Sequence, residues 1–276
     1  MKAAKVPVKY LQYSNADVEM ISTEVIVETP VSLTVNAEIW LTFMCTPVDL
    51  EALAVGFLFN EGVIRTMDEV ASVRLCEAGD NVDVWLYHNA DKPDKWRRTS
   101  GCTGGFTSLE EDAYITPVSN GGVLPANRIG DLIALLFESQ QLYRQSGGVH
   151  TSGLSDGKAM LIVTEDIGRH NTLDKLAGRC LMEAISPTGK LILTTGRISS
   201  EMLQKAARMG VSILISRTSP SSLSIELAER LGVTLIGYAR RNRFNVYSHP
   251  QRIVADISAV RNADGHPVGL VESGAP

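Results

Sequence analysis

One cysteine of this chain, Cys102, stands in the segment TSGCTGGFTS, residues 99–108, among glycines and hydroxyl side chains. A thiol carries out nucleophilic or sulfur-carrying chemistry as the thiolate, and glycine neighbours make a loop accessible and mobile. Arg97 and Arg98 lie close by in the sequence and would favour the thiolate. The segment is compatible with a reactive thiol or with an incidental loop cysteine, and spacing alone does not choose between them.

The other three cysteines, Cys45, Cys76 and Cys180, each occur in apolar, periodic surroundings. Free cysteine usually behaves as a small hydrophobic residue, so we expect these three thiols to be buried. The chain contains no C-x-x-C pair, which argues against a zinc knuckle, and we expect no zinc or other resident metal.

Arginines follow each of four apolar segments in the second half of the chain. Parallel strands place their carboxyl ends on one edge of a sheet, where helix N-termini also present free N–H groups. Since guanidinium groups bind phosphate oxygens bidentately, we expect this edge to hold an anion with several charges. The alternative is that these arginines are solvated or paired with carboxylates. The arginines are Arg169, Arg197, Arg217, Arg240, Arg241 and Arg243, and the hydroxyl residues beside them are Ser199, Ser200, Thr218 and Ser219.

Two further polar segments contain histidines. In EDIGRHNTLDK, residues 165–175, His170 is a candidate proton shuttle, phosphate donor or core histidine, with Asp166 or Asp174 orienting it or Arg169. In GGVHTSGL, residues 147–154, a zinc deaminase would need H-x-E, but the residue two after His150 is a serine and no P-C-x-x-C follows. Deaminase chemistry is therefore excluded, and no standard P-loop or dinucleotide-binding motif occurs either.

The elements that must position these groups predict an α/β fold. Short apolar strands alternate with amphipathic helices in the second half, which is typical of a parallel or mixed sheet layered with helices. A smaller β-rich part precedes it, and we expect the parts to be 1–123 and 124–276, with the boundary between 93 and 124, or to form one compact unit. Ser219 before Pro220 predicts a helix N-cap. The predicted strands lie within 24–44, 71–78, 81–88, 159–168, 191–197, 211–217 and 233–248, and the predicted helices within 48–63, 126–145, 169–185, 199–210 and 219–232.

Composition excludes several classes of protein. Lys plus Arg number 26 against 31 for Asp plus Glu among 276 residues, and a net charge of −5 argues against a general nucleic-acid binder. No apolar run approaches the ~20 residues that span a bilayer, and the N-terminus lacks the apolar region of a secretory signal. We expect a cytoplasmic protein that does not bind membranes. The first 20 residues and the tail after Ser248 give no signal.

Six blocks of this sequence together resemble the formate dehydrogenase accessory proteins, which are sulfur carriers for the molybdenum cofactor. The resemblance covers roughly residues 24–247, most of the chain, and the E-D-x-G-R-H-N and T-G-R-x-S-x-E-M patterns are long and specific. The blocks are, in order, TPVDLEALAVGFLFNEGVI, the SGC of the cysteine loop, GGVHTSGL, EDIGRHNTLDKLAG, TTGRISSEMLQKAARMG and GYARRNRFNVYS.

The resemblance implies a sulfurtransferase that takes persulfide sulfur from a cysteine desulfurase and passes it to a bis-molybdopterin guanine dinucleotide cofactor for formate dehydrogenase. It implies that Cys102 is the persulfide cysteine, that the C-terminal domain is similar to cytidine deaminase without zinc, and that the protein is a homodimer. Besides Arg169, Arg197, Ser199 and His170 at the strand ends, the cofactor-binding residues implied are Tyr238, Ala239, Arg240, Arg241, Asn242 and Arg243.

The cysteine loop departs from the family in one position. Many members carry C-x-x-C there, whereas this chain has Gly105 in the second position. A relay through one thiol remains open because exchange needs one attacking thiolate at a time. A cofactor-binding chaperone without sulfur transfer is the alternative, and a nucleotide-hydrolysing enzyme is disfavoured because no metal or nucleophile–base motif occurs.

Overall fold

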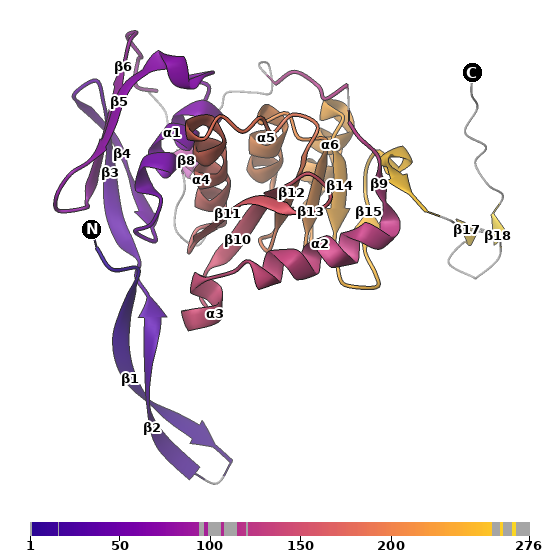
Figure 1. Ribbon diagram of the computed structural model, residues 1–276, viewed down its shortest axis with the longest axis horizontal. Coiled ribbons are helices and arrows are strands. Elements are labelled where there is room, and N and C mark those ends of the chain that lie inside the picture. Colours follow the sequence, from indigo (N-terminus) through magenta and orange to yellow (C-terminus); the bar gives the residue numbers. More distant parts are fainter. Residues whose placement is uncertain are drawn as a thin grey trace.

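The computed structural model describes residues 2–15, 17–93, 115–119 and 121–255, together with four short strands beyond them. In this part of the chain a six-stranded sheet with helices on both faces forms the body, and a four-stranded sheet and an N-terminal hairpin are attached to it (Figure 1). The four short strands are β7 (Arg97–Arg98), β8 (Phe106–Thr107), β17 (Val260–Arg261) and β18 (Pro267–Val268).

The six-stranded sheet is mixed, with the order β11-β10-β12-β13-β14-β15. β12, β13 and β14 are parallel, and β10 is antiparallel to both β11 and β12. β11 therefore runs in the same direction as β12, β13 and β14, so these four strands end on one edge. The strands are β10 (His150–Ser155), β11 (Met160–Asp166), β12 (Leu191–Thr194), β13 (Ile213–Ser216), β14 (Thr234–Gly237) and β15 (Asn245–Val246).

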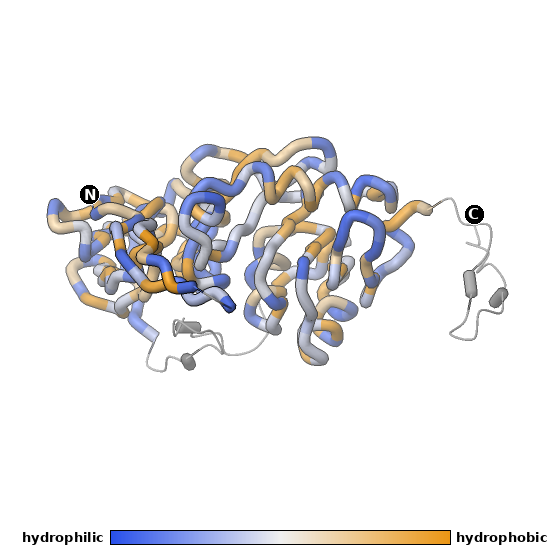
Figure 2. Tube along the Cα trace, turned by 90° about the horizontal axis from the view of Figure 1, so that it is seen from below, coloured by the Kyte–Doolittle hydropathy of each residue, from blue (hydrophilic) through white to orange (hydrophobic). Residues whose placement is uncertain are grey.

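Alternation along the strands directs apolar side chains to both faces of this sheet, as expected for a sheet covered on two sides. Ile192 and Leu214 pack against α4, α5 and α6, whereas Leu193 and Ile215 pack against α2 on the other face. In Figure 2 hydrophobic residues alternate with hydrophilic ones along the tube of the body. The helices are α2 (Ala126–Glu138), α3 (Leu142–Ser146), α4 (Arg169–Met182), α5 (Ser200–Arg208) and α6 (Ser222–Leu231). No helix among the described residues is long and apolar enough to cross a membrane.

The N-terminal part is a second sheet, ordered β4-β3-β6-β5, that packs on helix α1 around its own apolar core. Helix α1 also lies directly against α4 of the body. Gly56 and Gly178 permit this contact, since a Cβ on Gly56 would lie 1.7 Å from the Asp174 carbonyl oxygen and one on Gly178 would lie 1.9 Å from the Ala52 carbonyl oxygen. The elements are β3 (Thr29–Val35), β4 (Glu38–Cys45), α1 (Leu50–Asn60), η1 (Met67–Glu69), β5 (Val70–Leu75) and β6 (Asn81–Leu86).

The predicted α/β class, with a mixed sheet and a β-rich N-terminal part, is confirmed. Strand β10 was not predicted: its sequence, HTSGLS, is polar in composition, but five of its six residues are buried, and it lies between β11 and β12. The N-terminal hairpin of β1 (Lys5–Ser14) and β2 (Asp17–Ile26) was not predicted either. Nothing here tests the division at residues 123 and 124, which remains a prediction.

The predicted helix over 126–145 is wrong as one element. α2 ends at Glu138 and α3 begins at Leu142, because Gln140 is buried and donates from its side chain to Thr151 (2.7 Å). The Glu165 carboxylate then accepts hydrogen bonds from three backbone N–H groups at the start of α3, those of Gln141, Leu142 and Tyr143 (2.8, 2.8 and 3.0 Å). These hydrogen bonds satisfy backbone N–H groups that an uninterrupted helix would have bonded internally.

The predicted N-cap at Ser219 is also wrong. The cap of α6 is Ser221, whose hydroxyl accepts a hydrogen bond from the Ser224 N–H (3.2 Å). Ser219 instead accepts a bond on its carbonyl from the Ile198 N–H (3.1 Å), which ties this loop to the loop after β12.

Because α1 and α4 approach closely at Gly178, a methyl group added at this position should lower the stability of the fold. Gly178→Ala must push the helices apart, and we expect a loss of about 1–3 kcal/mol in the free energy of unfolding, the usual cost of overpacking. Urea denaturation measures it. Gly122→Ala is the matched control, because a Cβ there meets no atom within 4 Å. Equal stability of the two variants would contradict this account of the contact.

Candidate functional site

The candidate site is the sheet edge at which β11, β12, β13 and β14 end. The parallel direction of these four strands brings the arginines that follow them to one side of the molecule, as expected. The antiparallel strand β10 begins on the same edge and adds His150, which the sequence did not place there. α4 and α5 also begin on this edge, so their N-terminal N–H groups point toward it.

Arg169 and His150 lie beneath the loop that follows β12. Arg169 is buried at 7% exposure, and a Cβ on Gly196 would lie 2.9 Å from its Cβ and 3.6 Å from His150 Nδ1. Thr195 Oγ1 lies 3.5 Å from that Nδ1 and accepts a hydrogen bond from the Thr151 N–H (3.0 Å). Burial, followed by the charge of Arg169, lowers the pKa of His150, so a neutral imidazole is favoured.

His170 connects the beginnings of α4 and α5. Its Nε2 lies 3.1 Å from Glu201 Oε2 and 3.3 Å from Ser199 Oγ, and Ser199 is the N-cap of α5. Burial lowers the pKa of His170 despite the opposing effect of Glu201. Burial raises the pKa of Glu201, but the hydrogen bond and charge of His170, with Lys205 and Arg169, outweigh it and lower that pKa overall. His170 is thus a buried connecting residue, and Ser199 serves helix α5 as its cap.

Two arginines of the edge interact with neighbouring protein groups. The Arg217 guanidinium lies 5.1 Å from the centre of the Phe137 ring and donates to the Ala239 carbonyl (3.3 Å). Arg240 donates from Nη1 to the carbonyls of Arg217 and Ala239. These bonds hold the segment after β14 in place, and Gly130 of α2 allows it to pass closely, since a Cβ there would lie 2.2 Å from the Arg241 carbonyl oxygen.

The other residues predicted to bind the cofactor differ in how far their side chains are exposed to solvent. Arg197, Arg241 and Arg243 are exposed, as are Tyr238 and Asn242, whereas Ala239 is fully buried. The alternative of arginines paired with carboxylates does not describe Arg217 and Arg240, which bond carbonyl oxygens. The edge thus offers exposed guanidinium groups, the buried Arg169 and helix N-termini, a combination suited to phosphate groups.

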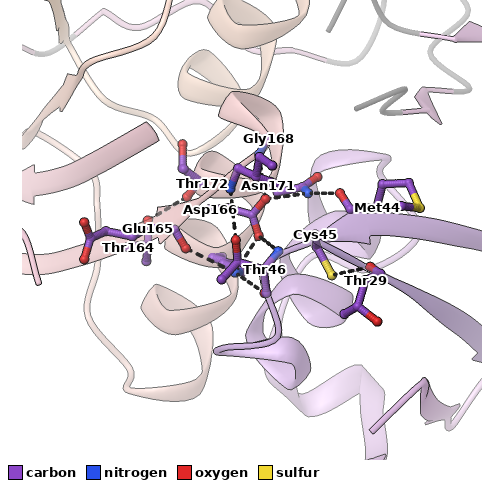
Figure 3. A network of polar contacts seen from close by, with 12 residues as sticks. Thr29, Met44, Cys45, Thr46, Thr164, Glu165, Asp166, Gly168, Asn171 and Thr172 are labelled. Atoms are coloured by element: carbon purple, nitrogen blue, oxygen red, sulfur yellow. Dashed lines mark hydrogen bonds and ion pairs between the residues drawn. The ribbon is translucent and has the colours of Figure 1, made fainter. Parts of the chain in front are cut away.

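A buried polar network holds the turn before α4 (Figure 3). The Asp166 carboxylate lies 2.6 Å from Lys175 Nζ, with both side chains 0% exposed, and accepts bonds from the N–H groups of Thr46 (3.1 Å) and Gly168 (2.7 Å) and from Asn171 Nδ2 (2.9 Å). The hypothesis that Asp166 also orients His170 or Arg169 stays a prediction. Asp166 fixes the backbone that carries them.

Asp174 has a similar structural role. It receives two bonds from Lys205 (2.6 Å each) and one from the Asn60 amide (2.7 Å), all buried between α1, α4 and α5. The hypothesis that Asp174 orients His170 or Arg169 likewise stays a prediction.

Two of the three described thiols, those of Cys45 and Cys180, are poor nucleophiles. Burial raises the pKa of Cys45 and of Cys180 to about 12 in each case, so both remain protonated at neutral pH. The prediction of burial is wrong for Cys76, which is half-buried and donates from Sγ to the Asp80 carboxylate (3.1 Å). Cys102, the predicted persulfide cysteine, lies outside the described residues.

Ser152 stands where a zinc deaminase would need a glutamate. Ser152, two residues after His150, is buried and its hydroxyl bonds those of Thr172 (2.7 Å) and Thr194 (3.0 Å). Among the described residues no three His, Cys, Asp or Glu side chains are arranged to hold a metal ion. The sequence reasoning missed Glu201, whose signal was its position two residues after the N-cap Ser199, in the first turn of α5.

Most of the chain is similar in sequence and in fold to known proteins. Residues 26–254 match the model of the FdhD/NarQ family. Relatives named sulfur carrier protein FdhD from Bacillus subtilis and Staphylococcus aureus are 38% and 34% identical, each over 88% of this chain and over 95% and 94% of the relative. A crystal structure described as a formate dehydrogenase accessory protein from Desulfotalea psychrophila matches with a TM-score of 0.75 at 31% identity, over 91% of this chain and 100% of that chain.

The lowered pKa of His170 predicts how stability depends on pH. A histidine whose pKa is lowered by folding binds fewer protons in the folded than in the unfolded state. The free energy of unfolding should then fall as the pH drops from about 7 to 5, by at most about 1.4 kcal/mol per pH unit for one histidine.

Urea titrations at several pH values test this expectation. His170→Gln should flatten the dependence in that range, whereas His249→Gln, which changes a histidine away from the edge, should retain the slope of the unmodified protein. His150, whose pKa is also lowered, would supply a residual slope. An unchanged slope in His170→Gln would show that this histidine titrates normally.

Proposed function

The chain belongs to the FdhD/NarQ family, and we propose that it is a sulfur carrier required for formate dehydrogenase activity. In this proposal Cys102 receives persulfide sulfur from a cysteine desulfurase and passes it to a bis-molybdopterin guanine dinucleotide cofactor, which is held as cargo. The carrier thus acts as a sulfurtransferase, in the cytoplasm and as a homodimer. The observation that carries the proposal is the arginine-lined sheet edge in a chain whose relatives are named sulfur carriers.

The sulfur steps follow ordinary thiol–persulfide exchange. The Cys102 thiolate attacks the outer sulfur of the desulfurase persulfide, a new S–S bond forms at Cys102, and the desulfurase cysteine leaves as a thiolate. In the second step the S–S bond breaks again and Cys102 leaves as a thiolate. The sulfur atom passes to the metal of the cargo, which supplies the two electrons that make a sulfido ligand.

The properties of the other thiols support the choice of Cys102. Cys45 and Cys180 are buried with pKa values near 12, and the half-buried Cys76 donates from Sγ to the Asp80 carboxylate. Cys45 and Cys180 therefore do not suit exchange with a second protein, which requires an accessible thiolate. One thiol suffices for each exchange step, so Gly105 in place of a second cysteine is compatible with the relay.

The sheet edge supports the choice of cargo. Arg197, Arg241 and Arg243 are exposed there in a protein whose net charge is −5. Guanidinium groups and helix N-termini both favour phosphate oxygens, of which a guanine dinucleotide carries several. The Glu201 carboxylate, which lies close to the start of α5, is engaged within the protein by His170, whose Nε2 lies 3.1 Å from its Oε2.

A cofactor-binding chaperone without sulfur transfer is the second candidate. The observation that favours it is Gly105, which removes the second thiol of the loop. Both candidates use the same arginine edge, so only the behaviour of Cys102 separates them.

Intact mass spectrometry after incubation with a cysteine desulfurase and free cysteine tests the carrier role. We expect one added sulfur atom that maps to Cys102 and is absent in Cys102→Ala, because only this thiol is expected to be an accessible thiolate. Cys76→Ala is the matched control and should still gain sulfur. A protein that gains no sulfur while the desulfurase itself is loaded would favour the chaperone, and sulfur on another cysteine would refute the assignment.

Binding of GDP, measured by calorimetry, tests the cargo site. Arg197→Ala and Arg241→Ala should each weaken binding about 10- to 100-fold, since one charge-assisted hydrogen bond contributes about 1.5–3 kcal/mol. Arg74→Ala, which removes an exposed arginine of β5 far from the edge, is the control and should bind as the unmodified protein does. Equal affinity in all four proteins would place the anion elsewhere.

A further inference from the structure

A pocket of about 390 Å³ lies where helices α1, α4 and α5 end, and residues 186–188 of the loop after α4 also line it. Figure 1 shows these three helices side by side. Helices α4 and α5 begin at the arginine-lined edge, so the pocket is at their other end, about 20 Å away along the 14 residues of α4. None of the described residues assigned to the cargo lines this pocket, which we call the helix-end pocket.

Most of the wall of the helix-end pocket is apolar. Ala177, Cys180 and Met209 are buried, and burial keeps the Cys180 thiol protonated by raising its pKa to about 12. Pockets that bind small molecules typically combine apolar walls with a few polar groups that fix the orientation of the ligand. This lining therefore suits a ligand with an apolar body. The apolar side chains include those of Phe59, Ala177, Cys180, Leu181, Ile185 and Met209.

Two arginines supply the charge of the pocket. Among the described residues that line it, Arg65 and Arg208 are the charged ones, and Arg65 is exposed whereas Arg208 is half-buried. The Nε of Arg208 is buried and has no hydrogen-bond partner within the described part of the chain. Gly62 leaves room for this guanidinium group, since a Cβ there would lie 2.5 Å from Arg208 Nη1. A guanidinium group that is partly removed from water and short of acceptors favours a ligand that supplies them.

The neighbouring charges leave the pocket positive. Burial lowers the pKa of Arg208 and the charge of Glu61 opposes that effect, but an arginine stays protonated at neutral pH. Arg65 adds a second positive charge, which offsets the charge of Glu61. At the end of α4, Glu183 lies 2.5 Å from Arg179 Nε and is neutralised by it. Positive charge therefore remains for an anionic ligand.

The ends of the three helices do not require a cation. The C-terminal end of a helix carries partial negative charge and unbonded carbonyl groups. Here the chain itself bonds carbonyls beside the pocket, since the Ile185 N–H donates to the Cys180 carbonyl (2.9 Å) and the Gly62 N–H to that of Phe59 (3.0 Å). Arg208 stands in the last turn of α5 and compensates for the partial charge of that helix.

We propose that the helix-end pocket binds a small organic anion in which one carboxylate is attached to an apolar body. The planar guanidinium group of Arg208 matches a carboxylate, which accepts two parallel hydrogen bonds from such a group. The apolar body then contacts Phe59, Leu181 and Ile185. A phosphate group fits less well, because its second negative charge meets the C-terminal ends of three helices, whereas the arginine-lined edge faces helix N-termini. The site is independent of the sulfur transfer and cargo binding of the proposed function.

Calorimetric titration of the full chain with octanoate tests this assignment. We expect saturable binding at one site per chain, and Arg208→Ala should weaken it about 10- to 100-fold because charge-assisted hydrogen bonds are lost. Arg74→Ala, which removes an exposed arginine of β5, is the matched control and should bind octanoate as the unmodified protein does. 1-Octanol and octyl phosphate have the same apolar chain, and each should bind about 10-fold more weakly than octanoate or weaker still.

A second variant tests the pocket without removing a charge. Thr188 is exposed on the loop that lines the pocket, so Thr188→Trp should fill part of the cavity and weaken octanoate binding. Thermal unfolding checks that this variant and Arg208→Ala stay folded. Both should bind GDP as the unmodified protein does, because the arginine-lined edge lies at the other end of α4 and α5.

Four outcomes would overturn the assignment. Octanol that binds as tightly as octanoate would show an apolar pocket without an anion site, and tighter binding of octyl phosphate would show a phosphate site. An unmodified protein without saturable octanoate binding, or unchanged affinity in either variant, would refute binding at this pocket. Loss of GDP binding in the edge variants bears only on the cargo of the proposed function, so the two sites stand or fall separately.

Discussion

The buried pair of Lys175 and Asp166 is the interaction on which the arrangement of this protein depends. Two fully buried charges are costly unless they are paired and hydrogen-bonded, and Asp166 meets this condition with four donors. Lys175 also donates to the carbonyls of Thr46 and Glu165. The pair therefore joins the end of β4 to the turn between β11 and α4, and so connects the N-terminal sheet to the body.

The site follows from that junction. Because the turn at 166–168 is fixed, α4 begins with Arg169 and His170 at the sheet edge. His170 then contacts Ser199 and Glu201, which sets the start of α5 beside it. Further along α4, Asp174 binds Lys205 of α5 and Asn60 of α1. The edge is therefore rigid because helices from both parts of the chain hold it through buried charges.

The rigid sheet edge suits the cargo of the proposed function. A cargo with several phosphates is best held by groups that are already oriented, since less conformational freedom is then lost on binding. The thiol, in contrast, must meet a desulfurase and a cofactor in turn. In the proposed function the body therefore binds the cofactor, and Cys102 exchanges the sulfur.

Much of the fold could be predicted because it depends on local pattern. The alternation of apolar strands with amphipathic helices predicted a sheet covered by helices. Because the predicted strands end on one edge of that sheet, the arginines that follow them lie on the same side of the molecule, as expected. Prediction failed where long-range bonds outweigh local preference. Strand β10 is polar in composition but buried. The predicted helix over 126–145 is interrupted by the hydrogen bonds of Gln140 and Glu165. The sequence of the hairpin formed by β1 and β2 showed no recognisable strand pattern.

The sequence by itself determined which residue types follow the predicted strands, which family the chain resembles and which cysteine has glycines beside it in the sequence. Only the tertiary structure decided what those residues do. Asp166 and Asp174 each pair with a buried lysine. Arg217 and Arg240 donate to carbonyl oxygens. His150 lies at the sheet edge because the antiparallel strand β10 begins there. The physical reason is that burial and pairing depend on neighbours distant in sequence, which no local pattern specifies.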